Sequence, residues 1–534
     1  MHTQRLGLFL FAAALAGGCS AGGDDAPGDG ASIAEAARTA PGEESVSARI
    51  QSGSNMTVLG VTDDDYALVW DSRSVWASPL RCGAKRVLVA SDVPEPPLTL
   101  VRGRAALLWT AQPYLGNIPG PQVVSPLVVW TAKDGPHLAS TASLAPQLFS
   151  IQASAAVRPD GREVLFTSNV SADGSVGDIV RASTDLARVD TLLAGVDVSL
   201  AACPPHVGYD RDALHGAPRV IVSACGPGAT TATLSRWAGD RRVDLTTDML
   251  PNSWWTSDEG GKHVLAQLSD RSPAVFTLDD AFTVVDDHRA AVGWITPDGT
   301  VFQTPTTADH TAREVLRITL DPAPRAERVT TLPAFSGFQF ANHLPYGMPY
   351  ANVSTVPTAP NGGFMMAFTQ FNAVNGTVTD SLRVDATATD AAPIASSADP
   401  VSLPAFEIAT RDSRFNLFHV FAPDAFVAST LHAGNDRGET WQVSNGQTAL
   451  GVFGLTGSKI AFADNVTAGL FDGNVTATGD LVIADVAARR PPRTLARGAR
   501  ALFFVTASRD AIVYTSDADP AGPGLFARRI GGSL

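Results

Sequence analysis

Cysteines are the residues of this chain whose chemistry depends most on the compartment. The chain has four of them. An oxidising compartment lets cysteines form disulfides, whereas closely spaced reduced cysteines can bind zinc. There is no Cys-x2-Cys spacing and no histidine pair, so we expect no zinc site. Cys203 and Cys225 each lie beside turn-forming Pro and Gly residues, and a bridge between them would close a short loop. Cys82 could instead pair with either one, because sequence alone does not determine connectivity.

Acidic and imidazole side chains are the next candidates for chemistry. The run Asp63-Asp64-Asp65 could contact calcium, because hard cations take carboxylate oxygens. It lacks the glycine and glutamate framework of a calcium loop, so a solvated acidic turn is the preferred interpretation. No other cofactor is predicted. The histidines occur singly, and those in turn-rich segments are expected at the surface rather than as ligands: His206, His215, His343 and His432.

Motifs that would indicate a known catalytic machinery are missing from the sequence. There is no Gly-x-Ser-x-Gly nucleophile elbow, no His-Glu-x-x-His, no phosphate-binding loop and no dinucleotide fingerprint. We therefore predict no catalytic residues and no metal ligands. An enzyme such as a lactonase or lyase stays open as an alternative, because distant segments can converge on one site in a way that sequence spacing does not reveal.

The first residues read as a targeting segment rather than as part of the fold. Arg5 precedes an apolar stretch from Leu6 to Ala16 that is too short to span the ~30 Å hydrocarbon core of a bilayer. Gly17-Gly18-Cys19 follows and resembles the lipobox of bacterial lipoproteins, although Ala16 stands where that family usually has Leu. The resemblance implies a signal peptide over residues 1–18, cleavage before Cys19 and lipid attachment at Cys19.

The segment after Cys19 has the composition of a tether. It is rich in Gly, Ala, Asp, Ser and Pro, which predicts a flexible linker over residues 19–50. Ser20 stands where the inner-membrane retention signal of lipoproteins would have Asp, so the resemblance favours the outer membrane. The protein would face the periplasm or the cell surface.

The rest of the chain, 51–534, must position any functional side chain, and its pattern is β-rich. Short apolar runs, most of which end in an aromatic residue, recur roughly every 40 to 60 residues, near 70, 109, 166, 221, 265, 302, 368, 462 and 514. Polar turns precede most of them, as at Asp160-Gly161, where Gly can supply a positive φ. This period predicts an all-β propeller of roughly seven or eight four-stranded blades. Tandem β-sandwich domains are the alternative.

One repeat resembles a known family. Residues 156–169, which contain Pro159-Asp160-Gly161 and the strand Val164-Leu165-Phe166-Thr167-Ser168, are similar to the WD40-like repeat of TolB-type propellers. Gly177-Asp178-Ile179-Val180 completes the match. The resemblance implies a propeller that serves as a protein-interaction platform.

A second motif resembles the Asp-box (BNR) of sialidases and related propellers. It consists of Asp436, Gly438, Thr440 and Trp441, and Gly434 stands where the family has serine. The Asp-box is a structural hairpin, so it marks a blade corner. The arginine motif of sialidases is missing, and sialidase activity is not expected. The Asp-box still motivates an alternative function as a carbohydrate-binding or carbohydrate-active propeller.

Charge and composition restrict the partners. The net charge is −14 and no block of Lys or Arg forms a phosphate-binding stripe, so nucleic acid is not expected as a partner. The preferred hypothesis is a lipid-anchored, non-catalytic propeller of the cell envelope. It would bind an envelope protein or peptide, with a glycan as the alternative ligand, and would contact the membrane through its N-terminal lipid.

Overall fold

A computed structural model describes residues 48–530 of this protein. Gaps occur at 82–83, 114–122, 147–153, 159, 200–201, 210–218, 252, 254, 258–262, 271–272, 278–281, 285–292, 296–299, 304, 306, 308, 310, 321–323, 334–335, 341–364, 373–376, 386–391, 397–404, 411–413, 423–424, 436, 438, 450–451 and 468–476. All named elements of this part are β-strands. No helix among these residues is long and apolar enough to cross a membrane.

Eight sheets have four antiparallel strands each, paired in sequence order. The first four sheets contain β2 (Thr57–Val61), β3 (Tyr66–Trp70), β4 (Val75–Pro79), β5 (Val87–Ala90); β6 (Pro97–Arg102), β7 (Ala105–Pro113), β8 (Val124–Thr131), β9 (Gly135–Leu144); β10 (Ala156–Val157), β11 (Glu163–Ser168), β12 (Val176–Ser183), β13 (Val189–Asp197); β14 (His206–Tyr209), β15 (Arg219–Ala224), β16 (Ala232–Ala238) and β17 (Arg241–Met249).

The next four sheets repeat this plan. They contain β18 (Trp255–Ser257), β19 (His263–Gln267), β20 (Pro273–Thr277), β21 (Phe282–Val284); β22 (Gly293–Ile295), β23 (Val301–Gln303), β24 (Ala312–Thr319), β25 (Arg325–Pro333); β26 (Ser336–Phe340), β27 (Met365–Asn372), β28 (Thr377–Asp385), β29 (Ala392–Ser396); β30 (Ala405–Ala409), β31 (Phe415–Ala422), β32 (Ala425–Asn435) and β33 (Thr440–Gln442).

A seven-stranded sheet completes the molecule. Its order is β1-β39-β38-β37-β36-β35-β34, with β1 (Ala48–Ser52), β34 (Val452–Gly454), β35 (Lys459–Asp464), β36 (Thr478–Asp485), β37 (Arg493–Val505), β38 (Ala511–Ser516) and β39 (Gly524–Arg529). The long strand β37 pairs with β36 through its first half and with β38 through its second half. The sheet is therefore two four-stranded units that share β37, and the second unit takes its fourth strand, β1, from the other end of the chain.

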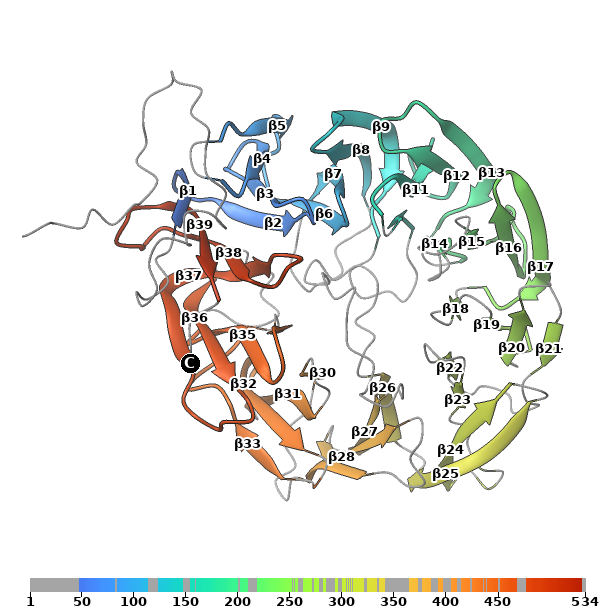
Figure 1. Ribbon diagram of the computed structural model, residues 1–534. Coiled ribbons are helices and arrows are strands. Elements are labelled where there is room, and N and C mark those ends of the chain that lie inside the picture. Colours follow the sequence, from blue (N-terminus) through green and yellow to red (C-terminus); the bar gives the residue numbers. More distant parts are fainter. Residues whose placement is uncertain are drawn as a thin grey trace, which may run out of the picture.

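The sheets follow one another around a ring, as Figure 1 shows. Each sheet packs its faces against the sheets before and after it. A single buried cluster joins Val513, Val69, Leu107 and Phe166, which come from the second strands of four consecutive units. Burial of apolar side chains on both faces explains why these second strands are continuous apolar runs rather than alternating ones.

The structure confirms the predicted all-β propeller class. Each of the nine recurring positions found in the sequence falls on the second strand of a different unit, from β3 to β38. The blade count differs from the prediction: the described residues form eight separate four-stranded sheets, and the seven-stranded sheet adds two more units, which gives ten rather than seven or eight. The unit β30–β33 has no recurring position, because Asn416 and His419 interrupt the apolar run of its second strand.

Candidate functional site

Strand direction divides the ring surface into two faces. The turns that join the first to the second strand and the third to the fourth strand of each unit lie on one face, which we call the turn face. The turns between second and third strands, and the links from one unit to the next, lie on the other face, which we call the crossover face. Hydrogen bonds between neighbouring units respect this division: Asp63 N donates to Gly103 O at 2.7 Å on the turn face, and Val198 N donates to Ser175 O at 2.9 Å on the crossover face.

The predicted blade turn Asp160-Gly161 lies on the turn face, between β10 and β11. Gly161 N donates to Arg158 O, and the Asp160 carboxylate contacts the Arg158 guanidinium at 3.0 Å. Gly161 has φ +68° and lies so close to the β6–β7 turn that an added Cβ would be 2.7 Å from Arg104 N. The turn therefore connects two strands of one unit and also lies against the adjacent unit.

The acidic run Asp63-Asp64-Asp65 also forms a turn on this face. Thr62 Oγ1 donates to Asp64 Oδ1 at 2.6 Å, and Asp65 has φ +61°. Burial raises the pKa of Asp63, and the neighbouring Asp64 carboxylate adds to the rise. Burial also raises the pKa of Asp65, with a further contribution from Asp510. No group of three or more His, Cys, Asp or Glu residues in the described part of the chain could hold a metal ion.

An ion-pair network on the turn face joins the units β10–β13 and β14–β17. Arg181 on β12 is 5% exposed and contacts Asp190 Oδ2 and Asp240 Oδ1, each at 2.9 Å. Its Nη1 also donates to Gly239 O at 2.7 Å. Arg188 contacts the same two carboxylates. Because the Arg181 side chain is buried while it spans two units, these contacts position one sheet against the next.

Glu163 and Tyr209 lie at the same junction. Burial raises the pKa of the Glu163 carboxyl, although Arg181 and the Tyr209 hydroxyl oppose the rise. Burial likewise raises the pKa of Tyr209, which is 7% exposed. The hydroxyl faces Glu163 without a hydrogen bond of standard geometry. The sequence gives no sign of this junction, because its members are separated by tens of residues and no local pattern connects them.

The Asp-box-like segment forms the turn between β32 and β33, again on the turn face. Asp436 and Gly438 lie outside the described residues. Thr440 is exposed, and Trp441 is partly buried, with its ring 5.7 Å from Phe415 in an edge-to-face arrangement. The Arg489 guanidinium lies over the Trp441 ring, 4.0 Å from its centroid. This arginine comes from the next unit and also pairs with Glu439 at 2.5 Å, so the turn forms another contact between blades.

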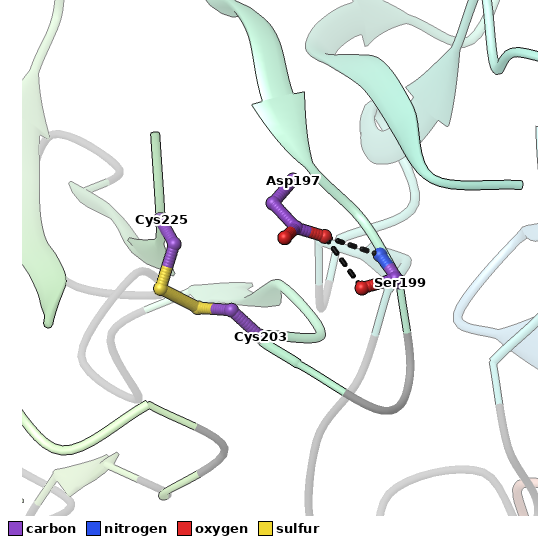
Figure 2. The surroundings of a disulfide bond; sticks show 4 residues. All are labelled: Asp197, Ser199, Cys203 and Cys225. Carbon is purple, nitrogen blue, oxygen red and sulfur yellow. Dashed lines mark hydrogen bonds between the residues drawn. A yellow bond between two sulfur atoms is a disulfide. The ribbon is translucent and has the colours of Figure 1, made fainter. Parts of the chain in front are cut away.

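The disulfide lies on the crossover face. Cys203 and Cys225 are bonded and both are buried, at 3% and 1% exposure. The bond connects the link that enters β14 to the β15–β16 turn. Figure 2 shows Asp197 nearby, with Ser199 N and Oγ donating to its carboxylate at 2.8 and 2.6 Å. Cys19 and Cys82 lie outside the described residues.

The expected surface position of His206 is wrong. His206 lies on β14, is 5% exposed and stacks on Trp255 with ring centroids 4.7 Å apart. Burial lowers its pKa to about 3, so the ring is neutral at physiological pH. The β14 strand packs against the neighbouring β18 strand, and this buries a residue that the turn-rich sequence suggested would be exposed. His432 on β32 is partly buried, and His215 and His343 lie outside the described residues.

Comparisons with known proteins find solved structures that are similar to this chain in fold. No family model matches the chain, and no curated protein matches it. Among solved structures, it is similar to oligogalacturonate lyase in complex with manganese, at 12% identity and TM-score 0.35 over 71% of this chain and 98% of that chain. It is also similar to the eukaryotic initiation factor, at 12% identity and TM-score 0.42 over 75% and 89%. TolB from Acinetobacter baumannii matches at 14% identity and TM-score 0.27 over 63% and 81%. At these levels of sequence identity, the similarities describe the fold and not the function.

Proposed function

We propose that this protein is a lipid-anchored β-propeller of the bacterial cell envelope, of the TolB type, and that it acts as a non-catalytic platform for an envelope protein or peptide. Cys19 carries the lipid, the residues from there to 47 form the tether, and the outer membrane holds the anchor. The expected tether boundary at residue 50 is too late, because Ala48–Ser52 forms β1 and pairs with β39. The lipobox-like sequence at Gly17-Gly18-Cys19 and the TolB-like repeat at 156–180 support this proposal.

The observation that carries the proposal is that charged side chains on the turn face form ion pairs between neighbouring units. Arg181 and Arg188 bridge to Asp240 of the next unit, and Arg489 bridges to Glu439 of the preceding unit. These groups hold blades together and do not converge around one point. A rigid ring whose ionic groups serve its own assembly is suited to presenting a preorganised surface to a partner.

The described tryptophans do not favour the glycan alternative. A sugar-binding surface needs an aromatic ring whose face is open to solvent. Arg489 covers the Trp441 ring at 4.0 Å, and Arg86 covers the Trp76 ring at 3.9 Å. Trp109, Trp130, Trp237 and Trp255 are buried. Trp70 is partly buried, and its Nε1 donates to Val93 O at 2.9 Å.

A cross-linking pull-down from the native envelope tests the proposed function. The tagged wild-type chain is compared with Cys19→Ala, and both proteins and glycans in the eluate are identified. One envelope protein recovered in near-stoichiometric amount with the wild type, and lost with Cys19→Ala, would support the platform. Recovery of polysaccharide without a protein partner would contradict it. Mass spectrometry of the N-terminal peptide tests the acyl group at Cys19 separately.

A further inference from the structure

Among the described residues, the two faces of the ring carry opposite charge. Exposed cations project from the turns of five units on the turn face: Arg81, Lys85, Arg104, Arg162, Arg241 and Arg490. Exposed carboxylates occur instead along the crossover face: Asp92, Glu95, Asp173, Asp248, Asp309 and Asp517. Arg73 is an exposed cation on the crossover face. The turn face is therefore basic although the net charge of the chain is −14.

The turn face also contains acidic groups, but cations lie beside them. Asp240 lies between Arg181 and Arg188. Arg104 lies close enough to Asp63 to lower the pKa of that carboxyl, against the larger effect of burial. Asp65, Asp185 and Asp510 are also exposed on this face. Lys85, Lys133, Arg162, Arg241, Arg325 and Arg490 are further exposed cations, so cations outnumber carboxylates among the described exposed residues of the turn face.

The N-terminal strand relates this basic face to the anchor. β1 starts with Ala48 opposite Ala527 and runs to Ser52 opposite Gly524. Gly524 begins β39 at the crossover face, and β39 runs from there toward the turn face. Since β1 is antiparallel to β39, the chain enters the ring from the side of the turn face. The proposed tether, which ends where β1 begins at Ala48, therefore joins the ring on its basic side.

We propose that the turn face lies against a bilayer surface that carries anionic phospholipid headgroups, with the crossover face directed away from the membrane. This inference rests on the proposed lipid anchor at Cys19. The anchor keeps the ring close to the membrane, and the charge difference between the faces sets its orientation. Each Lys or Arg near an anionic surface contributes roughly a fivefold gain in membrane affinity, and salt screens the effect. The acidic crossover face is repelled by the same surface and stays open to a partner.

Hydrogen–deuterium exchange of the lipidated full-length protein tests the orientation. The protein is reconstituted in vesicles of phosphatidylcholine alone or of phosphatidylcholine with phosphatidylglycerol. We expect slower exchange in the turns 158–162, 239–241 and 486–490 with the anionic vesicles only, reversed by about 0.5 M salt. The crossover segments 171–175 and 517–523 should be unaffected. Equal exchange in both vesicle types, or slowing on the crossover face, would overturn the inference.

Two arginines provide a matched pair of variants. Arg162→Glu and Arg73→Glu make the same charge change at exposed positions on opposite faces. In the unlipidated chain from Ser20 onward, Arg162→Glu should weaken binding to the anionic vesicles at least roughly fivefold, whereas Arg73→Glu should not weaken it. Equal effects of the two variants would contradict the assignment of the face.

The two proposals fail in distinguishable ways. If mass spectrometry finds no acyl group at Cys19, the anchor is wrong, but the unlipidated chain still reports whether the turn face binds anionic lipid. If the acyl group is present and exchange does not depend on lipid charge, the anchor stands and the orientation is wrong.

Discussion

Gly161 meets two separate requirements that exclude a side chain. Its φ of +68° is costly for an L-residue, and an added Cβ would lie 2.7 Å from the backbone nitrogen of Arg104 in the adjacent unit. Gly174 has a similar φ of +72°, but no atom lies within 4 Å of its added Cβ. Comparing the two glycines therefore separates the cost of a positive φ from the cost of the close contact between blades.

We expect Gly174→Ala to lower the free energy of unfolding by about 1 kcal/mol, from the backbone alone. Gly161→Ala should cost at least about 1 kcal/mol more, because the β6–β7 turn must also move. Chemical denaturation of both variants against the wild type measures the difference. Equal losses would show that the close approach of the two turns is not tight.

Glu163 gives the junction between β10–β13 and β14–β17 a dependence on pH. Because its folded-state pKa is raised above the ordinary 4.5, its stabilising contribution is complete below that value and is lost as the pH rises through the folded-state pKa. Glu163→Gln imitates the protonated form. Its melting temperature should exceed that of the wild type at pH 7, and the difference should vanish below about pH 4.

The control for this comparison is Glu95→Gln, which removes a carboxylate at an exposed position on the crossover face. It should leave the difference in melting temperature close to zero at both pH values. A Glu163→Gln variant that is less stable than the wild type at pH 7 would mean that Arg181 stabilises the carboxylate more than burial opposes it.

At the scale of elements, one turn design recurs between second and third strands. Asn169 after β11 donates to Asp178 at 2.8 Å, and Asn465 after β35 donates to Asp480 at 3.1 Å. Both asparagines have positive φ, near 50°. Asn tolerates this conformation and its amide bonds the start of the next strand, so the same hairpin forms where the surrounding sequence differs. The pair gives a physical reason for the Asn and Asp of the TolB-like repeat.

The disulfide stabilises a link between units. The bond between Cys203 and Cys225 closes a loop with a sequence separation of 22, for which loop-closure entropy predicts about 3 kcal/mol. Replacing both cysteines by serine should lower the free energy of unfolding by about that amount. Reductant should lower the free energy of unfolding of the wild type to that of the double variant, and it should leave the free energy of the double variant unchanged. Because Cys82 is present in both proteins, a further loss in the double variant would indicate a second bond.

At the scale of the whole molecule, the ring closes through β1. This strand supplies the outer edge of the last unit, and Gln51 accepts a hydrogen bond from Ser78 Oγ of the first unit at 2.6 Å. Five residues far from the C-terminus in sequence therefore join the two ends of the ring. A propeller opened at this point would expose the edge of β39.

Removing β1 should open the ring. A chain that starts at residue 54 is expected to melt about 4 °C or more below a chain that starts at residue 48, because it loses the pairing with β39 and the contact with β4. A chain that starts at residue 41 serves as the control and should have the same melting temperature as the chain that starts at residue 48. If all three chains melt together, β1 is dispensable for closure.

Sequence by itself determined the local features of this protein. Apolar runs bounded by Asp-Gly and similar turns predicted strands, and the period of these runs predicted a repeated β-unit, because strand and hairpin formation depend on neighbouring residues. The local pattern gives no sign of β31, where polar residues interrupt the apolar run, and it does not show that the turn-rich segment at His206 is buried.

Tertiary structure alone decided which cysteines pair, which strand closes the ring and how charge divides between its faces. The bond between Cys203 and Cys225, the pairing of β1 with β39 and the bridge from Arg181 to Asp240 all join segments that are distant in sequence. Such contacts depend on the packing of complete blades around a closed ring. The spacing of residues along the chain does not predict that packing.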